Sequence, residues 1–146
     1  MNQYKELKEK QSKDIDVFPF IFAFTTERLN EQLKEKGLDI NNVKLCYIGN
    51  GIYMMEDDIP KYSEMVKKHN MQIEERIKQD LTGEGFIKDM FKTELKNYEY
   101  GYTLEVDDAI ERLGYTIDEI NKNPILKNGL ELAKKEILKE EEELEM

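Results

Sequence analysis

A run of eight apolar residues, VFPFIFAF at 17–24, is the feature that most constrains the fold. Phenylalanine stands at every second position from Phe18 to Phe24, and a period of two is the repeat of a β-strand, so the four rings share one face. The other face receives Val17, Ile21 and Ala23. A strand that is apolar on both faces is expected to be covered on both faces. Pro19 has no backbone N–H to donate, which places the strand near a sheet edge or a bulge.

A hairpin signal occurs further along the chain. Gly49-Asn50-Gly51 separates two more apolar stretches, VKLCYI at 43–48 and IYMM at 52–55. Glycine and asparagine adopt the positive φ angles of tight hairpin turns more readily than other residues. The sequence therefore predicts two antiparallel strands joined by this turn and, together with residues 17–24, a small sheet of about three strands.

Most of the remaining chain has helical signals, because apolar residues recur every three or four positions and capping residues stand between these stretches. Thr25-Thr26 opens a helix that Gly37 closes, and Asp57-Asp58 with Pro60 opens a long one. Further helices are expected over 2–15, 86–98 and 106–113, from a capping box at Thr116-x-x-Glu119, and from Pro124 onward. The last helix is expected to turn Leu126, Leu130, Ala133 and Ile137 inward and to fray within Glu140–Glu143, where like charges repel.

These elements predict a mainly helical α+β fold with a small antiparallel sheet packed by helices. A length of 146 residues fits a single compact domain, expected over residues 1–139, followed by an acidic tail over 140–146. Cys46 is the only cysteine, so no disulfide forms within the chain. The polar N-terminus has no signal-peptide core, and the run at 17–24 is too short to cross a bilayer. We therefore expect a cytoplasmic protein with no membrane partner.

Charge is concentrated in residues 98–119, YEYGYTLEVDDAIERLGYTIDE, where seven acids and one base give a net −6 out of −10 for the chain. Four tyrosines are interleaved with these acids, and tyrosine is enriched where proteins bind one another. Acidity disfavours direct nucleic-acid binding and favours a partner with a basic surface, although the same charge can serve solubility alone. The predicted protein-interaction residues are Tyr98, Tyr100, Tyr102, Asp107, Asp108, Glu111, Asp118 and Glu119.

The sequence favours structural roles for its candidate catalytic and binding groups. His69 and Cys46 are the only residues of their kinds, and both fall on apolar faces. The acidic pairs 57–58 and 107–108 stand where helices should start, which suits helix capping. Thr82-Gly83-Glu84-Gly85 precedes a helix but lacks the lysine of a phosphate loop. We therefore predict no enzyme activity, no cofactor and no metal site.

Four motifs carry a resemblance to a family. They are FPFIFAF at 18–24, GEGFIKDMF at 83–91, L-x-N-x-EYGYT at 95–103 and LGYTIDEI at 113–120. With them, residues 2–138 resemble an uncharacterised family of small acidic proteins from Firmicutes and their phages. No activity is assigned to that family, so the resemblance implies a biological context and transfers no functional residue. Small acidic phage proteins often bind and block host machinery, including defence systems.

Three functions remain open from the sequence. The leading hypothesis is a non-catalytic phage or mobile-element accessory protein that binds and inhibits a host protein, with acidic mimicry of nucleic acid as one route to anti-defence activity. The second is a protein that sequesters a small molecule or nucleotide signal, for which Lys88, Lys92 and Lys96 could form a basic wall. The third is a virion or replication accessory protein. A homo-oligomer is compatible with each of them.

Overall fold

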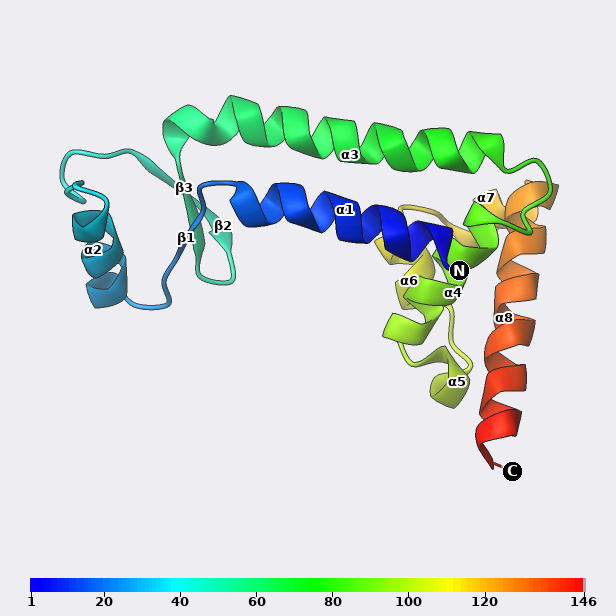
Figure 1. The fold of residues 1–146 in the computed structure, drawn as a ribbon. Helices are drawn as coiled ribbons and strands as arrows, with labels where there is room; N and C mark the ends of the chain where they lie inside the picture. Colours follow the sequence, from blue (N-terminus) through cyan, green and yellow to red (C-terminus); the bar gives the residue numbers. More distant parts are fainter. Residues whose placement is uncertain (146) are drawn as a thin grey trace. The chain divides into compact units, whose positions relative to one another are not determined.

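Helices dominate the structure, a computed structural model that describes residues 1–145 (Figure 1). Strands β1 (Ile21–Phe22), β2 (Leu45–Gly49) and β3 (Ile52–Met55) form one antiparallel sheet in the order β1-β3-β2. The predicted class, mainly helical α+β with a small antiparallel sheet, is confirmed. The helical elements are α1 (Gln3–Val17), α2 (Thr26–Glu35), the 3-10 turn η1 (Glu56–Asp58), α3 (Ile59–Gln79), α4 (Phe86–Asn97), α5 (Tyr100–Thr103), α6 (Asp107–Arg112), α7 (Ile117–Asn121) and α8 (Pro124–Glu145).

The chain divides into two compact units. Unit 1 consists of Met1–Gln11 and Met71–Met146, and unit 2 consists of Ser12–Asn70. Helices α1 and α3 each contribute one part to each unit. The single domain expected over residues 1–139 stays a prediction, because a division by contacts carries no information about folding cooperativity.

Unit 2 is built around the hairpin that the sequence predicts. Strand β3 pairs with β2 on one side and β1 on the other, and the turn uses Asn50 (φ 53°) and Gly51 (φ 74°). The Thr25 hydroxyl caps α2 by accepting a hydrogen bond from the Arg28 amide at 3.1 Å, as the sequence predicts. The core of unit 2 contains Ile21, Ala23, Leu29 and Leu33.

The expectation for residues 17–24 is wrong in two respects. Helix α1 extends through Val17, and the strand is reduced to Ile21–Phe22. Its second face is not covered within the unit, because Phe22 is exposed and Phe24 is 87% exposed. Phe18 and Phe20 instead contact each other (centroids 4.6 Å apart) and the ring of Tyr62. The alternating pattern identified the strand but not how much of it has a partner.

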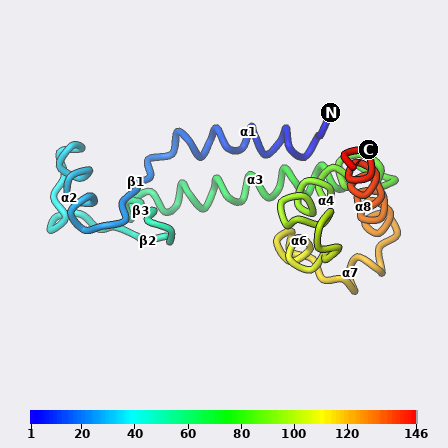
Figure 2. Tube along the Cα trace, turned by 90° about the horizontal axis from the view of Figure 1, so that it is seen from below, coloured from blue at the N-terminus to red at the C-terminus, as the bar shows by residue number. Residues whose placement is uncertain are grey.

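The core of unit 1 forms where α4 packs along α8, a pairing that both Figure 1 and Figure 2 show. Phe86, Met90, Phe91 and Leu95 are buried on α4, and the four predicted inward residues of α8 are buried as well. Gly83 and Gly129 lie where α8 comes close to the loop before α4 and to α4 itself. A Cβ on Gly129 would lie 2.9 Å from the carbonyl oxygen of Gly83 and 2.5 Å from Cγ2 of Ile87.

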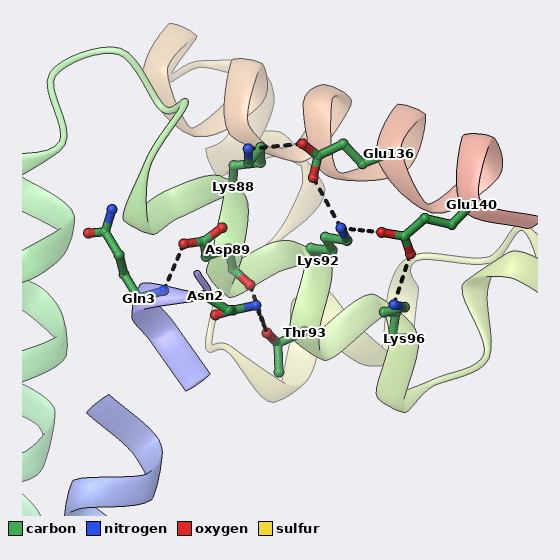
Figure 3. A network of polar contacts seen from close by, with 9 residues as sticks. All are labelled: Asn2, Gln3, Lys88, Asp89, Lys92, Thr93, Lys96, Glu136 and Glu140. Carbon is green, nitrogen blue, oxygen red and sulfur yellow. Dashed lines mark hydrogen bonds and ion pairs between the residues drawn. The ribbon is translucent and has the colours of Figure 1, made fainter. Parts of the chain in front are cut away.

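A ladder of ion pairs runs beside this core and joins the same two helices (Figure 3). The Glu136 carboxylate accepts from Lys88 at 3.0 Å and pairs with Lys92 at 3.3 Å. The Glu140 carboxylate accepts from Lys92 at 2.5 Å and pairs with Lys96 at 2.9 Å. The expected fraying within Glu140–Glu143 is therefore wrong, since α8 continues to Glu145. The lysines of α4 offset the repulsion among its acids.

The first turn of α1 is attached to α4 by polar contacts (Figure 3). The Gln3 amide donates to the Asp89 carboxylate at 2.8 Å, and the Asn2 side chain donates to the Thr93 hydroxyl at 2.9 Å. The Tyr4 hydroxyl donates to the buried Glu94 carboxylate at 3.0 Å. Burial and the charge of Glu94 both raise the pKa of Tyr4, so this phenol stays a donor. These bonds fix the position of Gln3.

Candidate protein-interaction surface

Helix α5 is a single turn between two left-handed residues. Glu99 precedes it at φ 61° and Leu104 follows it at φ 62°. Each left-handed residue other than glycine costs about 1–2 kcal/mol. Local bonds stabilise the turn, because the Glu99 carbonyl accepts from the amides of Tyr102 and Thr103, and the Tyr100 carbonyl accepts from Leu104 at 2.8 Å. These bonds close the single turn of α5.

The two tyrosines of this turn lie in opposite environments. Tyr100 is 6% exposed and belongs to the core of unit 1, whereas Tyr102 is 91% exposed. The burial of Tyr100 argues against its place among the predicted protein-interaction residues. Gly101 between them lies against the Glu141 side chain, whose Cγ would be 3.0 Å from a Cβ at this position. Tyr102 is the tyrosine of this turn that is available to a partner.

Apolar and acidic groups are exposed together around this turn. Leu104 is 62% exposed, and Tyr98 is also exposed at the end of α4. The acids of the same stretch are exposed too. We name these residues the α5–α6 surface: Tyr98, Glu99, Tyr102, Leu104, Glu105, Asp107, Asp108 and Glu111. An exposed aromatic ring with exposed acids close by in the sequence suits a partner that offers both apolar and cationic groups.

The acidic pair at the start of α6 is not engaged in capping. The N-cap position is Val106, with no side-chain cap, and Asp107 and Asp108 occupy the first turn. The expectation that one of the two caps this helix is therefore wrong. Both carboxylates remain near the positive end of a short helix, where negative charge is favourable. They add charge to the surface without a competing hydrogen bond to the first amides of α6.

The remaining predicted residues lie on α7. Asp118 is exposed, and the N-cap half of the predicted capping box forms, because the Thr116 hydroxyl accepts from the Glu119 amide at 3.2 Å. The Glu119 carboxylate accepts from the Thr116 hydroxyl at 3.1 Å. Nearby Tyr115 is half-buried, and burial together with the charges of Glu119 and Glu74 raises its pKa. Glu119 is thus engaged locally. Whether any predicted residue contacts a partner stays a prediction.

The sequence interpretation missed Leu104, Glu99 and Glu105 as members of this surface. Leu104 carried a signal, since it is an apolar residue outside any helical period and next to an acid. No sequence signal marked the left-handed conformations of Glu99 and Leu104, because asparagine or glycine is the usual marker of such positions.

The glycine-rich loop before α4 does not offer its amides to a ligand. The Asp80 carboxylate accepts from the amides of Thr82 (3.3 Å), Gly83 (2.9 Å), Gly85 (3.1 Å) and Ile87 (3.0 Å). Burial raises the pKa of Asp80, but these four bonds outweigh it and hold the pKa below its ordinary value. A carboxylate of the chain itself therefore occupies the place that a phosphate would take.

The basic wall considered for a nucleotide is also engaged. Lys88, Lys92 and Lys96 each pair with Glu136 or Glu140 in the ladder. Burial lowers the pKa of Lys92, but its hydrogen bonds to the two glutamates outweigh burial and raise it. A nucleotide at this face would have to replace ion pairs that are already made.

The two side chains considered for nucleophilic catalysis are both at least partly buried. His69 is buried on α3, and its Nε2 lies 2.8 Å from the Asp14 carboxylate. Cys46 is half-buried and is the second residue of β2. Residues 1–145 contain no cluster of three or more histidine, cysteine or acidic side chains able to hold a metal ion. No helix in the described part of the chain combines the length and apolarity needed to cross a bilayer.

Comparison with known proteins identifies a family whose function is not known. Neither the curated proteins nor the solved structures contain a match to this chain. One family model matches residues 3–136, which is nearly the whole chain and includes the α5–α6 surface. The chain therefore belongs to DUF7659, a family of unknown function.

Proposed function

We propose that this chain is a non-catalytic accessory protein of a phage or mobile element that binds a basic surface of a cytoplasmic host protein and inhibits it. The observation that carries the proposal is Tyr102, 91% exposed on a turn between two left-handed residues and flanked by acids. Left-handed non-glycine residues cluster at binding sites, because the strain is retained where the resulting geometry is used.

The chemistry of the surface supports a cationic partner. Residues 98–119 carry a net −6, which attracts a basic protein from a distance and speeds its association. Tyr102 and Leu104 supply the apolar contact that gives a complex its lifetime, because tyrosines near the centre of an interface contribute strongly. A host protein that binds nucleic acid presents such a basic groove, and the acidic residues would then imitate phosphate charge.

Affinity capture from a bacterial lysate, read by mass spectrometry, tests the proposal. The tagged chain is incubated at about 50 mM and about 300 mM salt, where the screening length falls from about 14 Å to about 6 Å. The proposal predicts a basic protein that is captured strongly at low salt and weakly at high salt. An acidic partner, or a partner whose capture does not depend on salt, would contradict charge recognition.

A further inference from the structure

An open cavity of about 570 Å³ lies within unit 1, and its lining includes no residue of the α5–α6 surface. Its lining comes from the first turn of α1, the end of α3, the loop after α3 and the start of α4. The lining residues are Gln3, Arg76, Gln79, Asp80, Gly85 and Phe86. The volume is that of an ordinary small-molecule site.

Arg76 is the only cation in this lining, and it has no carboxylate partner in residues 1–145. Its guanidinium lies over the Phe86 ring, 5.1 Å from the centroid, and its Nη2 donates to Gln3 Oε1 at 3.0 Å. Both neighbours are fixed, since Phe86 is buried and the Gln3 amide is bound to Asp89. The guanidinium is thus positioned by neutral groups, and its other N–H donors remain for a ligand.

This arrangement is unusual in so acidic a chain. The chain has 32 acidic and 22 basic residues, so most cations should find a carboxylate nearby. The one carboxylate in the lining, Asp80, instead has both oxygens bound by backbone amides. A half-buried cation without a counter-charge is costly, and an anion that fits the cavity would remove that cost. A guanidinium binds a carboxylate through two parallel hydrogen bonds.

We propose that this cavity binds a small monocarboxylate, whose carboxylate pairs with Arg76 and whose polar body contacts the side-chain amides of Gln3 and Gln79. A single negative charge is required, because the Asp80 carboxylate in the same wall repels a doubly charged phosphate. The carboxylate could belong to a free small acid or to the C-terminus of a peptide, and the two share this chemistry. The site is independent of the proposed host-protein surface.

The test is a titration of the ¹⁵N-labelled full chain followed by nuclear magnetic resonance. N-acetylglycine is the probe, its neutral analogue N-acetylglycinamide is the matched control, and inorganic phosphate tests the charge requirement. An acetylated tetrapeptide of alanines with a free C-terminus separates the two sources: tighter binding than N-acetylglycine assigns the site to a chain end, and weaker binding to a free acid. We expect saturable shifts at the amides of Gln3, Gln79 and Gly85 with a carboxylate probe, and binding at least about ten-fold weaker for the neutral amide.

Variants separate the site from general charge. Arg76→Gln should weaken N-acetylglycine binding by about ten-fold or more, whereas Lys78→Gln makes the same charge change on the exposed side of α3 and should leave it within about two-fold. If Arg76→Gln does not fold, the binding of N-acetylglycine and of N-acetylglycinamide to the natural chain is compared instead, and this comparison tests the proposal. No saturable shift with any carboxylate, equal binding of acid and amide, or tighter binding of phosphate would overturn the proposal.

Discussion

Tyr100 and Tyr102 stand two residues apart in one helical turn, yet Tyr100 is 6% exposed and Tyr102 is 91% exposed. Residues two positions apart on a helical turn point to opposite sides, so one ring meets the core of unit 1 and the other does not. One tyrosine therefore secures the turn to the core, and the other projects from it. Stability and binding can be separated by substituting them one at a time.

Tyr100→Ala should lower the free energy of unfolding by about 3 kcal/mol or more, because it removes a buried aromatic side chain. Tyr102→Ala should change it by less than about 0.5 kcal/mol, since an exposed ring loses no packing. Urea unfolding followed by circular dichroism measures both. Similar losses for the two variants would show that Tyr102 also packs against the chain.

Asp107→Lys/Asp108→Lys should slow association with the captured partner while leaving dissociation nearly unchanged, because long-range attraction acts mainly on the association rate. Asp57→Lys/Asp58→Lys is the matched control, since it also reverses an acidic pair at the start of a helical element, in unit 2. Surface plasmon resonance gives both rates. If the two pairs slow association equally, the effect belongs to net charge and not to the α5–α6 surface.

Gly129→Ala should destabilise the chain by about 1–3 kcal/mol. Alanine is the better helix former by about 1 kcal/mol, so a gain would be expected at an open position. The added Cβ would instead lie 2.5 Å from Cγ2 of Ile87. Lys127→Ala, at an exposed position of the same helix, is the control. A melting temperature raised by Gly129→Ala would refute the close approach of α8 to the loop before α4.

The ladder between α4 and α8 should make stability depend on pH. Burial raises the pKa of Glu136, but the hydrogen bonds that it accepts from Lys88 and Lys92 outweigh burial and lower this pKa. The pKa of Glu140 is lowered by the hydrogen bonds that it accepts from Lys92 and Lys96. A carboxyl group whose pKa is lower in the folded state stabilises the fold at pH values above its unfolded pKa, here 4.5. This stabilisation is lost as the pH falls through the folded pKa.

Glu136→Gln/Glu140→Gln should therefore cost stability at neutral pH, on the order of 1 kcal/mol because both carboxylates are partly exposed. The difference from the natural chain should vanish in acid. Glu142→Gln/Glu143→Gln removes two charges from the exposed side of α8 and serves as the control. Chemical unfolding across pH checks this. A cost that persists in acid would mean that packing, not charge, joins the helices here.

Local chemistry predicted most of the fold. The Thr25 cap, the hairpin at Asn50 and the box at Thr116 lie where the sequence placed them, since each depends on residues close in the chain. The extent of β1 depended on what covers Phe22 and Phe24, which periodicity does not encode. The ion-pair ladder could not be predicted from the sequence either, because Lys92 and Glu140 come together only when α4 and α8 pack in register.

For the candidate site, the sequence located the acidic segment but not the environment of its side chains. Composition alone located the acidic segment, and its charge is exposed as expected. Which tyrosine is accessible depends on the side of the α5 turn that meets the core, and local sequence does not signal this. The sequence does not single out Arg76, because whether a guanidinium has a carboxylate partner among residues 1–145 depends on three-dimensional packing.

The most direct test of the proposed function is affinity capture with three baits side by side: the natural chain, Tyr102→Ala/Leu104→Ala and Leu81→Ala/Leu144→Ala. The last pair removes equally exposed apolar side chains of unit 1 outside the α5–α6 surface. We predict that the natural chain and the Leu81/Leu144 variant capture the same basic host protein and that the Tyr102/Leu104 variant loses it. Undiminished capture by a folded Tyr102/Leu104 variant would contradict the proposed interface.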